Sequence, residues 1–120
     1  MEEKAKRQVA VRFLTPDEGG RRSGIPNLSS GQYMPHVVVG DSSRKGELTP
    51  LEALSGHHML GVRFVDGPTG AACGQNLPCV IELLYAGADY AALRAGAGIL
   101  VVEGRRIVAT GTVLADDRAG

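Results

Sequence analysis

The strongest constraint on the fold is a two-residue alternation of apolar side chains in short runs. In the run VAVRFL at residues 9–14, Val9, Val11 and Phe13 point to one side and the residues between them point to the other. Similar runs, enriched in β-branched residues, follow at 36–40, 60–65, 79–85, 98–104 and 106–114. The periodicity therefore predicts six β-strands.

Glycine and proline separate these runs. The chain has 17 glycines and 6 prolines, and most of them lie between the expected strands, where they turn the backbone. This pattern predicts an all-β fold, a single closed six-stranded antiparallel β-barrel with one or two short helical turns in loops. The candidate turns are TPLEALSG at 49–56 and ADYAALRAG at 88–96, which carry capping residues at both ends.

The chain length predicts one domain. A chain of 120 residues is long enough to bury one core, and no repeat or shift in composition divides it. We expect a single domain over 1–120, with a core at about 8–115 and tails at 1–7 and 116–120.

The charges give no strong long-range field. Thirteen basic and thirteen acidic residues cancel, so binding to nucleic acid or to a membrane would require local clustering. The start, MEEKAKRQ, lacks the apolar stretch of a signal peptide, and no run reaches the roughly 18 apolar residues of a membrane span. We expect a soluble cytoplasmic protein without membrane contact, with Cys73 and Cys79 as free thiols.

Three motifs carry a resemblance to a known family. EGGR at 18–21 follows the first expected strand, YMP at 33–35 precedes the second, and EGRRIVATGTV at 103–113 forms the last hairpin. In this order and spacing they resemble the C-terminal β-barrel, the third domain, of bacterial elongation factor Tu. The resemblance covers most of the chain and implies the same barrel as a stand-alone protein.

The sequence also departs from that family. Met34 replaces an arginine, Arg22 replaces a histidine, and the segment 46–58 is an apparent insertion. In the family, this domain packs on a GTPase domain and contacts the T-stem of aminoacyl-tRNA and a nucleotide-exchange partner. Because the chain contains no GxxxxGK[ST] phosphate loop, we expect neither nucleotide binding nor GTP hydrolysis.

Two arginine-bearing bends, DEGGRRSG at 17–24 and EGRR at 103–106, are the candidate contact residues. They can be read as ordinary turns whose charges are solvated. The resemblance instead implies that both bends lie on one face, which in the family meets the tRNA stem. Four guanidinium groups there could bind phosphates, although nearby acids offset them. The candidate partner-binding or RNA-binding residues are Gly19, Gly20, Arg21, Arg22, Glu103, Gly104, Arg105 and Arg106.

No metal or catalytic motif is evident in the sequence. His57 and His58 are adjacent, so on a strand they would face opposite sides, and with His36 and the cysteines they show no zinc-type spacing. There is also no G-x-S-x-G nucleophile motif. We therefore expect no cofactor, no metal and no catalytic residue.

The leading hypothesis is a non-enzymatic binding module that uses its arginine-bearing loops. A protein partner is favoured over RNA, because zero net charge suits a mixed-charge protein interface. One alternative is translation-related binding to a tRNA stem. Another is a small metal-dependent enzyme built around His57, His58 and the cysteines. Homo-oligomerisation also stays open, since a second copy can cover a barrel side.

Overall fold

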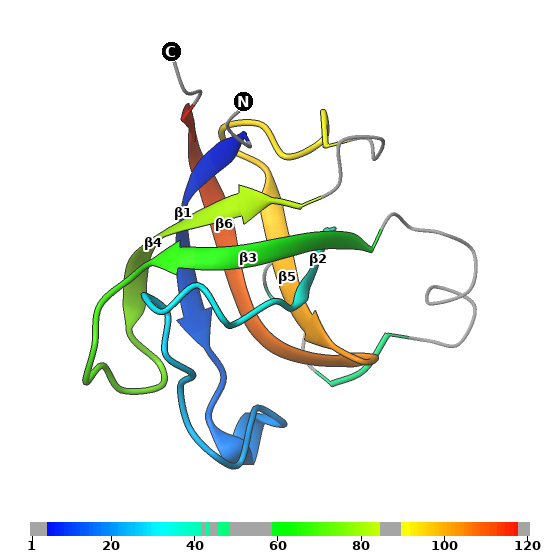
Figure 1. Ribbon diagram of the computed structural model, residues 1–120. Coiled ribbons are helices and arrows are strands. Elements are labelled where there is room, and N and C mark those ends of the chain that lie inside the picture. Colours follow the sequence, from blue (N-terminus) through cyan, green and yellow to red (C-terminus); the bar gives the residue numbers. More distant parts are fainter. Residues whose placement is uncertain (1–4, 42, 44–45, 49–58, 85–89, 118–120) are drawn as a thin grey trace.

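The protein folds into a closed six-stranded antiparallel barrel (Figure 1). The computed structural model describes residues 5–41, 43, 46–48, 59–84 and 90–117. The strands are β1 (Lys6–Phe13), β2 (His36–Val39), β3 (Leu60–Asp66), β4 (Asn76–Leu83), β5 (Gly98–Glu103) and β6 (Arg106–Asp117). Around the barrel they follow the order β1-β4-β3-β2-β5-β6, which returns to β1. The all-β barrel expected from the alternation is confirmed.

Strand β1 closes the barrel by pairing with both β4 and β6. Val9 lies opposite Cys79 on one side and opposite Val113 on the other. The β1–β6 ladder begins at the pair Lys6 and Asp117, so paired backbone extends beyond the expected core at 8–115 into both expected tails. Charged side chains do not prevent this, because the ladder is formed by backbone groups.

The barrel interior is filled by the alternating apolar residues. Val9, Val11 and Phe13 of β1, which the alternation placed on one face, are buried there together with Phe64 of β3 and Ile81 of β4. Such a small barrel is filled by side chains and leaves no wide channel. Its interior is therefore a core, and any contact site has to lie on its rim or outer surface.

A second apolar cluster lies against β5. It buries the β5 side chains that alternate with the β5 residues of the barrel core. Its members are Leu14, Val38, Leu48, Leu100, Val102 and Ile107. Leu48 belongs to a short segment that pairs with the β5–β6 hairpin, since the Leu48 N–H donates to the Arg105 carbonyl at 2.7 Å. The Ile107 N–H donates in turn to the Gly46 carbonyl at 2.8 Å. The described part of the apparent insertion at 46–58 thus fastens to this hairpin.

One short helical turn in a loop is described, as expected, but it is the 3₁₀ helix η1 (Pro16–Glu18) and does not lie in the described part of the candidate segment at 88–96. Residues 90–96 form two successive turns, closed by Leu93 N–H to Tyr90 carbonyl and Ala97 N–H to Arg94 carbonyl bonds, and no helix. The Leu93 carbonyl accepts a 2.6 Å hydrogen bond from Nε of the buried Arg7. This carbonyl therefore takes part in a tertiary contact and not in a helical hydrogen bond. The expected turn at 49–56 falls outside the described residues. Among the described residues, no helix is long and apolar enough to cross a membrane.

Candidate functional site

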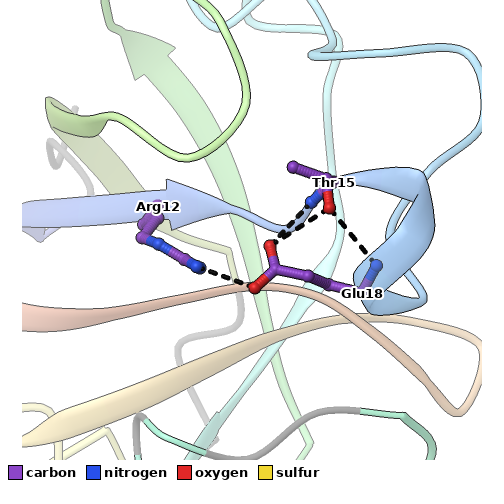
Figure 2. A network of polar contacts seen from close by, with 3 residues as sticks. All are labelled: Arg12, Thr15 and Glu18. Carbon is purple, nitrogen blue, oxygen red and sulfur yellow. Dashed lines mark hydrogen bonds and ion pairs between the residues drawn. The ribbon is translucent and has the colours of Figure 1, made fainter.

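The first arginine-bearing bend opens with a capped 3₁₀ turn, η1 (Pro16–Glu18). The Glu18 N–H donates to Thr15 Oγ1 at 3.3 Å, and the Thr15 N–H donates to Glu18 Oε1 at 3.0 Å, which is a capping box (Figure 2). Arg12 of β1 donates to the other Glu18 oxygen at 2.8 Å. The Glu18 carboxylate is thus engaged in holding the bend on the end of β1.

Two glycines then redirect the chain. Gly19 has a φ of 93° and donates its N–H to the Pro16 carbonyl at 3.0 Å, which ends the turn in the left-handed region. At Gly20 an added Cβ would lie 2.2 Å from the Leu14 carbonyl oxygen, so only glycine fits. Both glycines therefore have a structural role, and they deliver Arg21 and Arg22 to the surface.

The second bend is the two-residue turn of the β5–β6 hairpin. Glu103 pairs with Arg106, and Gly104 and Arg105 form the tip between them. Gly104 has a φ of 64°, as two-residue hairpin turns that follow the strand twist require of their first central residue. The tip exposes Arg105 and Arg106, while Glu103 is directed toward the first bend.

A polar cluster joins the two bends. Arg21 Nε lies 2.8 Å from Glu103 Oε2, and the same carboxylate oxygen accepts a 2.6 Å bond from the Tyr33 hydroxyl. The Arg21 guanidinium also lies 5.6 Å from the Tyr33 ring centre, and it donates to the Gly24 carbonyl at 2.7 Å. Burial raises the pKa of Tyr33, and the bond to Glu103 raises it further. The phenol is therefore held as a hydrogen-bond donor to Glu103.

The remaining arginines differ in their surroundings. Arg105 Nη2 lies 3.9 Å from Glu47 Oε2, a long and exposed ion pair. Arg22 and Arg106 are exposed, and neither has a salt-bridge partner in the part of the chain that the structure describes. These two side chains are the ones available to an external anion.

Two adjoining grooves share Arg22 and Arg106. One groove, of about 290 Å³, runs between the η1 turn and the 46–47 segment, and the other, of about 360 Å³, runs over Ser23 and Glu103. We name this surface the arginine face. Its lining residues are Pro16, Gly19, Gly20, Arg21, Arg22, Ser23, Gly46, Glu47, Glu103 and Arg106.

The structure thus brings the two predicted bends together, and it gives their four arginines different surroundings. Arg21 serves the fold, Arg105 is loosely paired, and Arg22 and Arg106 are open. The sequence interpretation did not identify Tyr33, which joins the two bends, or Glu47, which lines the face. The capping box was legible as the spacing T-x-x-E at 15–18, but the partnership of Tyr33 with Glu103 has no local signal.

The residues considered as metal ligands do not lie close together in the described part of the chain. No group of three or more His, Cys, Asp or Glu side chains among the described residues is placed to hold a metal ion. Cys79 is buried in the core and Cys73 is half-buried, while His36 is exposed on β2. His57 and His58 fall outside the described residues.

Comparison of the sequence with protein-family models and with curated proteins finds no match.

Proposed function

We propose that the protein is a non-enzymatic binding module whose arginine face binds an acidic segment of a protein partner. The observation that carries the proposal is that Arg22 and Arg106 both line two adjoining grooves, and that neither guanidinium forms a salt bridge to a described residue. Guanidinium groups bind carboxylates in a bidentate geometry and stay charged at all physiological pH values. Two such groups on one rim provide a defined anchor for a partner's acidic side chains.

The resemblance to the third domain of elongation factor Tu supports the same face, since that family uses the corresponding loops for its contacts. It also keeps a tRNA stem as the alternative partner. A protein is favoured, because acidic side chains are interspersed with the arginines and the net charge of the chain is zero. With two open arginines, neutralisation of about two phosphates would give a weak salt dependence for a duplex RNA stem, with a log–log slope of about −1.8.

The test compares three forms of the protein as bait in extract of the cell that makes it. The forms are the wild type, Arg22→Ala/Arg106→Ala, and the matched control Lys6→Ala/Arg94→Ala, which removes the same charge away from the face. Each extract is used with and without nuclease, and bound protein and RNA are identified separately.

We expect a protein that the wild type and the control retain, that the arginine variant loses, and that nuclease does not release. Retention of the same partners by all three forms would overturn the proposal. Loss of a bound tRNA from the arginine variant alone would assign the face to RNA instead.

A further inference from the structure

Ser23 differs from the other described serines in the state of its hydroxyl group. Ser29, Ser30 and Ser43 each engage the hydroxyl oxygen in a hydrogen bond within their own loop, at 3.1, 3.2 and 2.7 Å. The Ser23 side chain is exposed and has no hydrogen bond to any residue that the structure describes. Its hydroxyl is therefore accessible and is not held by a local contact.

The backbone that carries Ser23 is nevertheless fixed. Arg22 and Ser23 form a turn, and Arg21 closes it, because its Nη1 donates to the Gly24 carbonyl at 2.7 Å across both residues. Arg21 is itself bound to Glu103 of the hairpin at 2.8 Å. The turn is thus fastened to the barrel, while the side chains of Arg22 and Ser23 stay exposed.

The groove beside Ser23 contains two positive charges that no described side chain offsets. Its lining consists of Arg21, Arg22, Ser23, Glu103 and Arg106. Arg21 and Glu103 pair with each other, whereas Arg22 and Arg106 have no salt-bridge partner among the described residues. An anion attached at Ser23 would enter this groove, and neither open guanidinium would have to break a salt bridge to bind it.

A phosphate ester on Ser23 has the chemistry that this groove accepts. It carries a charge of about −1.5 to −2 at neutral pH and three oxygens that accept strong hydrogen bonds. Guanidinium groups bind phosphates in a bidentate geometry, and two of them supply the opposite charge. The same two arginines are the proposed anchors for the carboxylates of a partner, so the phosphate would compete with that partner.

We propose that Ser23 is a phosphorylation site, and that its phosphate group binds Arg22 and Arg106 and thereby blocks the arginine face. In the transfer, Ser23 Oγ forms a bond to the γ-phosphorus of a nucleoside triphosphate, and the bond from that phosphorus to the oxygen bridging to the β-phosphate breaks. The nucleoside diphosphate leaves with this oxygen, and the serine proton passes to a base of the protein kinase that catalyses the step. Blocking of a partner rests on the proposed function, whereas binding of the phosphate by the arginines does not.

The first experiment determines whether Ser23 is modified. Wild type, Ser23→Ala and the matched control Ser29→Ala are incubated with γ-phosphate-labelled ATP and extract of the cell that makes the protein, and the modified residues are mapped by mass spectrometry. We expect label at residue 23 in the wild type and the control, and its loss from Ser23→Ala. Absence of label at residue 23 from the wild type would overturn the site.

The second experiment determines whether the arginines bind the phosphate. Phosphoserine is installed at residue 23 or, as the control, in place of Thr69, which is exposed and lines a separate groove without charged residues. The second pKa of each phosphate is measured by phosphorus NMR. We expect the value at residue 23 to be lower by about half a pH unit or more, because opposite charges favour the dianion.

Arginine variants complete this measurement. Arg22→Ala/Arg106→Ala should raise the phosphate pKa at residue 23 to that of the control position, whereas Lys6→Ala/Arg94→Ala should leave it lowered. Equal pKa values at residues 23 and 69 in the wild-type background would overturn the proposed binding of the phosphate.

The extract pull-down separates this inference from the proposed function. The form with phosphoserine at residue 23 should lose the protein that the unmodified form retains through Arg22 and Arg106. Retention of that protein by both forms would overturn the blocking and leave the proposed function standing. If no bound protein depends on the two arginines, the proposed function fails and the blocking fails with it, while the NMR titration still decides whether the phosphate is bound.

Discussion

At the scale of single residues, neighbours in space decide what each arginine does. Arg21 and Arg22 are adjacent in the sequence, yet Arg21 is bound to Glu103 and lies by the Tyr33 ring, while Arg22 is exposed. The partner of Arg21 comes from the far end of the chain, so no local pattern distinguishes the two. The sequence could therefore identify the arginine doublet and could not assign its members.

Cys79 gives a prediction about alkaline pH. Burial raises the pKa of its thiol from 9.0 to about 11, and Asp66 adds to the shift. The fold therefore favours the neutral thiol, and the stability that this provides is fully present below pH 9 and is lost as pH rises toward 11. We expect the free energy of unfolding to fall by up to about 1.4 kcal/mol per pH unit in this window from Cys79 alone.

The measurement is urea unfolding of the wild type and Cys79→Ala at pH 8 and pH 10.5. Tyr33 also loses stabilising protonation in alkali, but it is present in both proteins, so the difference between them isolates Cys79. We expect the stability difference to shrink at the higher pH, because alanine has no proton to lose. A difference that is the same at both pH values would refute the prediction.

At the scale of elements, strand β6 fits against β1 only because residue 111 is glycine. A Cβ at Gly111 would lie 2.1 Å from the Ala10 carbonyl oxygen and 3.0 Å from the Val11 Cα. Both contacts are with backbone atoms of the closing ladder, which cannot move without separating the strands. We expect Gly111→Ala to lower the free energy of unfolding by about 3 kcal/mol or more.

Gly70→Ala is the control for this substitution. Gly70 has a φ of 69° and no atom within 4 Å of an added Cβ, so only backbone strain opposes alanine there. We expect a loss of about 1 kcal/mol in the same urea titration. Equal small losses for both variants would show that the β1–β6 ladder is looser than described.

The elements were largely predictable, and the exceptions have a common cause. Alternation depends on the burial of one strand face, which is why VAVRFL identified β1 and the residues that share its buried face. In the candidate helical segment at 88–96, the described residues 90–96 form turns and no helix, because tertiary hydrogen bonds compete with the local preference of the capping residues. Arg7 binds the Leu93 carbonyl, and the Tyr90 hydroxyl donates to the Gly61 carbonyl at 2.7 Å. Tertiary hydrogen bonds of this kind override weak local preference.

At the scale of the whole molecule, barrel closure creates the arginine face. The 17–24 and 103–106 bends are remote in sequence, and the order β5-β6-β1 places the end of β1 beside the β5–β6 hairpin. The sequence predicted the barrel from periodicity, and the resemblance predicted that the bends share a face. The role of the 46–48 segment could not be predicted, since its pairing with the hairpin depends on the assembled sheet.

The most direct test of this account measures whether the two bends are neighbours in solution. A nitroxide is attached at Ser23→Cys in a Cys73→Ala background, where the remaining Cys79 is buried, and paramagnetic broadening of backbone amides is recorded by NMR. The amides of Lys6 and Ala115 serve as the control. Lys6 begins β1 and lies about 23 Å along the strand from Phe13, which precedes the bend, and Ala115 pairs with Gln8 near the same end of β1 (Figure 1). We predict strong broadening at 103–106 and little at the control amides. Unbroadened amides at 103–106 would separate the bends and contradict the arginine face.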